Sequence, residues 1–268
     1  MMTTAVARPS TAMSSRLTRV PLLLAALLVL TAIAYPLTSG TGRDAVTWAI
    51  VLLGAAVSVL HATLAHGPRT GVGVFVVVLG AAVAFEAVGL ATGVPYGDYS
   101  YGPGLGPTVL GVPFLVPLAW LMMAWPSWVL ADRLAGSRRE ARVATAACIF
   151  AGWDVVLDPQ MVQAGYWTWA HPRPGLPGID TVPLTNLGGW LLAGAVLMTL
   201  LDVLVARTGV AGSPRIGDAA PLLALAWMTL GGALAHAGWL GLPGSAAWGA
   251  ALAVPVLVVL VRRRWAHR

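Results

Sequence analysis

Charge is scarce in this 268-residue chain, and lysine is absent from it. Only 10% of the residues are charged, whereas soluble globular proteins carry about 25%. Hydrophobic residues make up 58% of the sequence, and the mean hydropathy is +0.80. This balance excludes a water-soluble domain and a disordered chain. It predicts an all-α polytopic membrane protein.

Cysteine is nearly absent as well. The single residue, Cys148, excludes an internal disulfide and a metal cluster built from cysteines. His61 and His66 are five residues apart and have no further ligands nearby, and no HExxH motif occurs. The sequence therefore predicts no metal site.

Long apolar stretches recur along the chain, and each is near the length of about 20 residues that a membrane span needs. Eight candidate spans lie at 20–38, 45–65, 71–92, 108–131, 143–161, 187–206, 219–241 and 245–261. We expect one transmembrane helical domain over residues 20–261, with cytoplasmic tails at 1–19 and 262–268. In an alternative interpretation the first stretch is a signal peptide that is cleaved after Ala34, which leaves seven spans.

The arginines are distributed unequally between the connections. With the N-terminus in the cytoplasm, fourteen of the sixteen arginines fall inside, and only Arg43 and Arg173 fall outside. This asymmetry obeys the positive-inside rule and predicts a multi-pass protein of the bacterial plasma membrane with both ends cytoplasmic. Because the arginines set the orientation of the protein in the membrane, we expect no nucleic-acid partner.

Three acidic residues lie within the predicted spans, far from the arginines. At about 1.5 Å per helical residue, Asp154 is roughly 18 Å and Asp158 roughly 24 Å from Arg142. Glu86 is roughly 22 Å above Gly71 by the same measure. Ionisable groups at such depth are costly and mark functional sites by default. Asp154, Asp158 and Glu86 are therefore candidate catalytic residues in the outer half of the membrane.

The spacing of the two aspartates adds to this prediction. Asp154 and Asp158 are four residues apart and share one helix face. Two neighbouring carboxyl groups in a low-dielectric site tend to share one proton, which suits acid–base catalysis. An alternative for Asp158 is that it caps a helix end before Pro159. Asp202, a further acid, is expected to pair with Arg207 near the cytoplasmic surface.

Aromatic side chains gather at the level of these acids, mainly in two loops at 93–107 and 162–186. We expect them to bind an apolar substrate and to stabilise a transient cation, although part of the set also suits an interfacial belt. These candidates are Tyr96, Tyr99, Tyr101, Trp120, Trp153, Tyr166, Trp167, Trp169 and Trp190. His236, on a later span, is expected at a comparable depth and is a further candidate substrate-binding residue.

Two blocks of sequence carry a resemblance to a known family. The first is EAVG at 86–89 with TGVPYGDYSY at 92–101, and the second is WDVVLDPQM at 153–161 with GYW at 165–167. Over roughly residues 80–195 the chain resembles the bacterial and archaeal family of integral-membrane carotenoid biosynthesis proteins, of the carotenoid 1,2-hydratase or bisanhydrobacterioruberin hydratase type. The family commonly has Phe where Tyr96 stands. The first block adds Asp98 to the candidate substrate-binding residues, and the matching positions Pro183 and Asn186, which follow the second block, add Asn186.

The resemblance implies a hydro-lyase that adds water to the terminal C1–C2 double bond of an acyclic carotenoid. The partners would be a linear C40 or C50 carotenoid and water, with other enzymes of the pathway as candidate protein partners. No cofactor is implied, because protonation at C2 and capture of the C1 cation by water need none.

Two other functions remain open at this stage. A proton-coupled lipid transporter or flippase would also use intramembrane acids, although the sequence shows no repeated halves. Another isoprenoid-modifying membrane enzyme, such as a prenyl transferase, would need cationic side chains for a diphosphate beside its acids. Arginines are scarce on the side of the membrane where Asp154 and Asp158 are expected.

Overall fold

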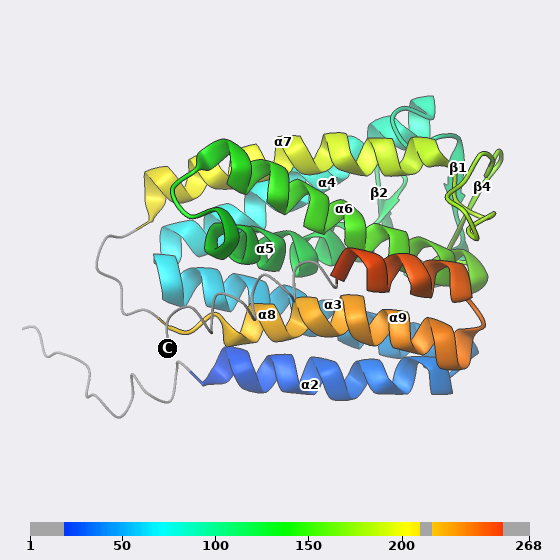
Figure 1. Cartoon of the computed structure of the whole chain (residues 1–268), viewed down its shortest axis with the longest axis horizontal. Helices are drawn as coiled ribbons and strands as arrows, with labels where there is room; N and C mark the ends of the chain where they lie inside the picture. Colours follow the sequence, from blue (N-terminus) through cyan, green and yellow to red (C-terminus); the bar gives the residue numbers. More distant parts are fainter. Residues whose placement is uncertain (1–18, 210–215, 254–268) are drawn as a thin grey trace, which may run out of the picture.

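In a computed structural model, which describes residues 19–209 and 216–253, the chain forms a bundle of long helices (Figure 1). The helices are α2 (Val20–Ala34), α3 (Gly40–His66), α4 (Pro68–Thr92), α5 (Leu115–Ala135), α6 (Arg139–Gln163), α7 (Leu184–Thr208), α8 (Ala219–Ala226) and α9 (Gly232–Ala235). The all-α membrane bundle predicted from composition is confirmed. The tail expected at 1–19, except for residue 19 itself, the tail expected at 262–268 and the end of the eighth span from residue 254 lie outside the described residues.

Six helical segments of the described chain are long and apolar enough to cross a membrane. They are Val20–Leu37, Gly40–His66, Pro68–Thr92, Leu115–Ala135, Leu184–Thr208 and Ala219–Leu240. α6 is as long as its neighbours but is less apolar, because it carries Asp154, Asp158 and several charges near its start. A last helix occupies residues 243–253 of the described chain, where the eighth span was expected.

The fourth expected span begins later than predicted. Residues 108–113 form a short hairpin of β2 (Thr108–Val109) and β3 (Val112–Pro113), and α5 starts only at Leu115. Leu110 and Gly111, in the two-residue turn, have φ values of 53° and 81°. A turn of this kind suits a tight hairpin and cannot continue a helix.

α5 lies at the centre of the bundle. It packs against α3, α4, α6, α7 and α8, and its residues from Leu115 to Ala131 are almost all buried. Because this helix faces other parts of the protein on every side, its apolar side chains are distributed all around it. Side chains from its first turns therefore line the space at this end of the bundle.

The two aromatic loops meet at one end of the bundle. β1 (Tyr99–Tyr101), in the first loop, pairs antiparallel with β4 (Trp167–Trp169), in the second, so that Tyr99 lies opposite Trp169. Figure 1 shows this two-stranded sheet beyond the ends of α6 and α7. The pairing joins segments that precede α5 and follow α6, and it covers that end of the bundle.

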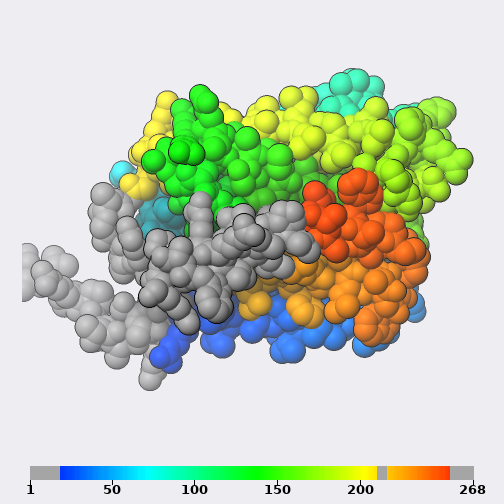
Figure 2. Space-filling view, viewed as in Figure 1, coloured from blue at the N-terminus to red at the C-terminus, as the bar shows by residue number. Residues whose placement is uncertain are grey.

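The segment Ala219–Leu240 is one helical rod with two wider turns. Its α-helical parts, α8 and α9, alternate with the π-helical turns η3 (Trp227–Gly231) and η4 (His236–Leu240). Figure 2 shows this part of the chain, in orange, between α2, in blue, and the green and yellow helices α6 and α7. π-Helical turns are rare and are frequently found at functional sites.

Candidate active site

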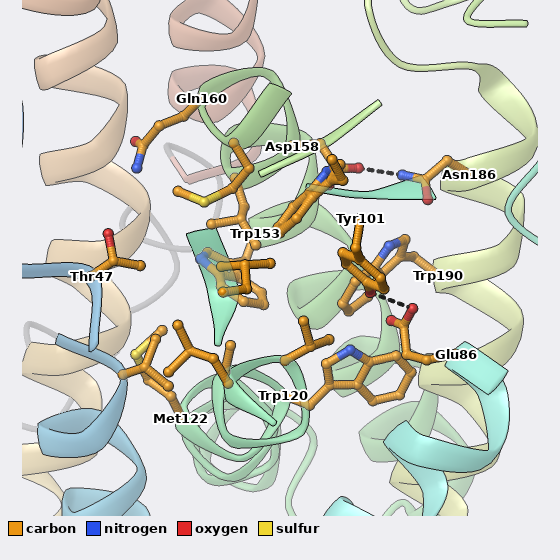
Figure 3. A pocket seen from close by; sticks show the side chains of 18 of the residues that line it. Thr47, Glu86, Tyr101, Trp120, Met122, Trp153, Asp158, Gln160, Asn186 and Trp190 are labelled. Atoms are coloured by element: carbon orange, nitrogen blue, oxygen red, sulfur yellow. Dashed lines mark hydrogen bonds between the residues drawn. The ribbon is translucent and has the colours of Figure 1, made fainter. Parts of the chain in front are cut away.

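A cavity of about 90 Å³ lies beneath the β1–β4 sheet, between the helix ends of α3, α4, α5, α6 and α7. Its wall is mostly apolar and aromatic, with a few polar side chains (Figure 3). Three of these polar side chains are Glu86, Asp158 and Asn186. The space is enough for several water molecules.

Glu86, on α4, forms one side of the cavity and is 5% exposed. Its Oε2 accepts a hydrogen bond from the hydroxyl of Tyr99 and another, of 2.7 Å, from that of Tyr101. The two tyrosines are two residues apart on β1, so both side chains point to the same face of the strand. The local alternation of the strand thus supplies both donors to one carboxyl oxygen.

Both tyrosine hydroxyls stay protonated. Burial raises the pKa of Tyr99 and of Tyr101 well above the usual range, and the charge of Glu86 raises it further. A protonated hydroxyl can donate a hydrogen bond, and donation to a carboxylate stabilises its ionised form. The two donors therefore favour an ionised Glu86, whereas its burial favours the neutral form.

Asp154 and Asp158 lie on the opposite side and are held together by Asn186 from α7. The Nδ2 of Asn186 donates a hydrogen bond of 2.9 Å to Oδ2 of Asp154, and it donates a second hydrogen bond to Oδ2 of Asp158. Trp167 Nε1 donates 3.1 Å to the other oxygen of Asp158. One amide group thus uses both of its hydrogens to hold two carboxyl groups side by side.

The two aspartates differ in which cavities they line. Asp158 lines the main cavity and also a second cavity of about 20 Å³ behind it, whereas Asp154 lines only the second. Asp154 is 1% exposed, and its Oδ1 has no hydrogen-bond partner among the described residues. A single proton shared by the pair would satisfy this oxygen and remove one of the two buried charges.

Asp158 does not cap a helix end, as one interpretation of the sequence had it. α6 continues past Pro159 to Gln163, and Asp158 lies inside the helix. Its carboxyl is committed to Asn186 and Trp167, which come from other elements.

Aromatic rings fill the space between the two acidic sides. Trp120 lies 4.9 Å from Trp190 between ring centroids, and Phe150 lies 5.0 Å from Trp190. Trp153 meets Trp190 edge-on at 6.1 Å. Figure 3 shows Trp190 and Tyr101 between Asp158 and Glu86. The faces of such rings attract positive charge.

Most residues that the sequence nominated for substrate binding do line the cavity. They are Tyr96, Tyr99, Tyr101, Trp120, Trp153, Trp167, Trp169, Asn186 and Trp190.

Three nominated residues lie elsewhere. Asp98 is exposed in the turn before β1, because successive residues there alternate between the two faces. Tyr166 is buried and donates 2.6 Å to Asp44, away from the cavity wall. His236 is packed behind Gln160, 2.9 Å from its Oε1, and bonds to Ser245 at 2.6 Å. The depth of His236 along its helix was a poor guide, since depth does not fix the direction of the side chain.

Several wall residues were not nominated from the sequence. Gln160, Thr47 and Met161 line the cavity together with Tyr35 and Leu157. Gln160 lies within the recognised block at 153–161, which was the one sequence feature that could have indicated it. Thr47 and Tyr35 come from α3 and the short 3₁₀ turn η1 (Tyr35–Leu37), outside both blocks.

The remaining buried acid, Asp202, belongs to a separate cluster at the other end of the bundle. It pairs with Arg142 at 2.6 Å and with Arg139 at 2.9 Å. The predicted pairing of Asp202 with Arg207 was therefore wrong. The arginines that pair with Asp202 come from α6, and not from the next turn of α7. No group of three or more His, Cys, Asp or Glu residues suited to a metal ion occurs in the part of the chain that the structure describes.

Comparison with known proteins gives two matches to this sequence. Residues 46–259 match the model of a family described as carotenoid biosynthesis protein. A curated relative, the bisanhydrobacterioruberin hydratase of Haloarcula japonica, is 36% identical over 128 residues. That alignment covers 46% of this chain and 42% of the relative, so it spans less than half of the curated protein. No solved structure matches the chain.

Proposed function

The chain belongs to the family of carotenoid biosynthesis proteins, and from that premise we propose that it hydrates the terminal C1–C2 double bond of an acyclic carotenoid. The observation that carries the proposal is the pair of opposed acidic groups across an aromatic cavity. One side holds two carboxyl groups on a shared amide, and the other holds a carboxylate on two tyrosines. The hydratase name of the relative in Haloarcula japonica supports the same reaction.

The proton comes from the aspartate pair. Asp158 faces the cavity and touches the substrate, so it delivers the proton to C2 of the alkene. Asp154 acts through its neighbour: it keeps one proton on the pair because two adjacent buried charges are unfavourable. The new C2–H bond leaves a tertiary cation at C1 and a negative charge on the aspartates.

The aromatic wall stabilises the cation while it exists. Trp120, Trp153 and Trp190 line the cavity between the two acidic sides. Each ring face contributes roughly 0.5–2 kcal/mol to a nearby cation in a desolvated site. These contributions count toward the rate, since they act on the charge that develops in the transition state.

Water captures the cation on the side of Glu86. The Tyr99 and Tyr101 hydroxyls hold the Glu86 carboxylate, whose free lone pairs orient a water molecule toward C1. As the C1–O bond forms, the proton of this water passes to Glu86. Its return to the aspartate pair through water in the cavity resets the site. The net change is the addition of one water to one double bond.

The substrate is a linear carotenoid of C40 or C50 length in the bilayer of the plasma membrane. An apolar cavity opening among membrane helices suits such a substrate, and it needs no soluble domain to carry it.

Isotope labelling tests the reaction directly. Membranes that contain the protein are incubated with the unhydrated carotenoid in H₂¹⁸O, beside membranes without it. We expect one labelled oxygen per modified end, in a tertiary alcohol. A pigment of unchanged mass would contradict the proposal, and its transfer between leaflets would instead support a transporter.

A further inference from the structure

Two larger cavities continue from the candidate active site along one face of α6. The first, of about 290 Å³, shares Tyr35, Trp153, Leu157 and Gln160 with the site. The second, of about 410 Å³, follows toward the start of α6 and shares Trp153 and Val156 with the first. Trp153 borders all three spaces, so they adjoin one another along α6, and we call the three together the trough.

The α6 side of the trough is a single helical stripe. Thr145, Cys148, Gly152, Val156 and Gln160 recur at intervals of three and four residues, which places them on one face. From Thr145 to Gln160 this stripe extends about 22 Å at 1.5 Å per residue. Its length follows the direction of the bundle axis and hence of the membrane normal.

The opposite wall comes from the rod with two π-helical turns. η3 and the glycines at its end, Gly231 and Gly232, face α6 across the trough. A Cβ at Gly232 would lie 3.2 Å from Val156, so the absence of a side chain there lets this segment pack closely against α6 where the two cavities adjoin. No charged side chain lines either of the two larger cavities within the described residues.

We propose that this trough holds the polyene chain of the substrate, with its reacting end in the cavity between Asp158 and Glu86. This inference rests on the proposed function. The two larger cavities carry no charged side chain among the described residues and follow α6 for about 22 Å, which suits a rigid linear hydrocarbon. The polyene then lies along α6. Its reacting end is at the β1–β4 sheet, and the rest of it extends toward the start of α6.

The single native cysteine provides a direct test. Cys148 is exposed and lines the trough, so a membrane-permeant maleimide should modify it in the empty protein. At ten times its dissociation constant, the long carotenoid should slow this modification about tenfold. A short isoprenoid with the same end group should not protect Cys148, because it does not extend past Trp153.

A matched variant supplies the control for labelling. In the double variant Cys148→Ala/Val76→Cys, the thiol lies on α4, where Val76 is 60% exposed and lines none of the cavities described here. Its modification should be the same with and without carotenoid. Equal protection at both positions, or none at Cys148, overturns the trough.

A second variant tests the trough through turnover. Gly152→Leu narrows it near Leu252, 3.3 Å from the new Cβ, and should raise KM for the long carotenoid about tenfold. The KM for the short isoprenoid should rise less, because that substrate does not extend past Trp153. Ala141→Leu, on an exposed part of the same helix, is the control. If the wild type hydrates the carotenoid and Gly152→Leu leaves KM unchanged, the trough alone is contradicted. If the wild type does not hydrate the carotenoid, the proposed function is contradicted.

Discussion

At the scale of single residues, a few hydrogen-bond donors hold the three carboxyl groups of the candidate site in place. Asn186 gives both amide hydrogens to two aspartates, and Tyr99 and Tyr101 give their hydroxyl hydrogens to one oxygen of Glu86. In the first arrangement the closeness of two buried carboxyl groups favours one shared proton, and in the second the two donors favour an ionised carboxylate. Acid and base are thus assigned by their surroundings, since all three groups are carboxyls.

Removing the acid should abolish most of the activity. Asp158→Asn keeps the volume of the side chain and removes the proton donor, so hydration should fall roughly 10²–10⁴-fold. Asp154→Asn should cause a loss of the same order, because a single remaining aspartate ionises and gives up the shared proton. Turnover is measured per folded protein in the H₂¹⁸O assay. Near-normal turnover in both variants would assign the acid to Glu86.

Asp202→Asn is the matched control, since it removes an equally buried aspartate far from the cavity. Asp202 is 3% exposed and accepts from Arg139 and Arg142. Its loss should lower the free energy of unfolding by about 1–3 kcal/mol and leave the turnover of the folded protein unchanged. Thermal unfolding in detergent measures the first effect. A large loss of turnover here would show that removal of any buried acid is harmful.

The tyrosine donors should affect the rate more than binding. Tyr99→Phe and Tyr101→Phe each remove one hydrogen bond to a charged group, worth about 1.5–3 kcal/mol, so kcat should fall about 10- to 100-fold. KM for the carotenoid should change little, because the ring remains in the wall. A rise in KM at constant kcat would place these residues in binding only.

At the scale of elements, the site requires close packing of α7 against the loop that leads into β1. Adjacent glycines on α7 separate this effect from helix propensity. A Cβ at Gly189 would lie 2.6 Å from Tyr96, whereas a Cβ at Gly188 would meet nothing within 4 Å.

Gly189→Ala should therefore push Tyr96 and its loop away from α7. Overpacking of this kind costs about 1–3 kcal/mol, and turnover should fall because β1 carries the donors to Glu86. Gly188→Ala should be neutral or stabilising by up to about 1 kcal/mol. Both are compared by thermal unfolding and by hydration. Equal effects of the two substitutions would contradict the close approach.

At the scale of the whole molecule, the candidate site lies at one end of the bundle and the arginine–aspartate clusters at the other. Asp202 and Asp218 each pair with arginines near the ends of α5 and α6 that are remote from the β1–β4 sheet. The positive-inside rule assigns that end to the cytoplasm. Hydration would then occur in the outer leaflet.

Reporter fusions test this orientation. Fusions after Arg43 and after Arg173 should report an external location, and fusions after Arg138 and after Arg207 an internal one. The expectation follows from the distribution of fourteen arginines against two. An internal reporter at Arg173 would place the candidate site at the cytoplasmic surface.

The sequence alone determined the membrane class, the approximate spans and the three carboxyl groups of the site. These are local properties: hydrophobic length decides whether a segment can span, and the rise per residue gives the depth of Asp154, Asp158 and Glu86. The same local reasoning placed the start of the fourth span too early, since it could not detect the hairpin at 108–113.

Only the tertiary structure decided which side chains meet. Depth along a helix does not fix rotation or neighbours, which depend on how helices pack. Packing turns Asp158 toward the main cavity and Asp154 behind it, moves His236 out of the site, and pairs Asp202 with α6 instead of Arg207. The bonds from Tyr99 and Tyr101 to Glu86 need the sheet between two loops that are distant in sequence, and no pattern within either loop encodes that pairing.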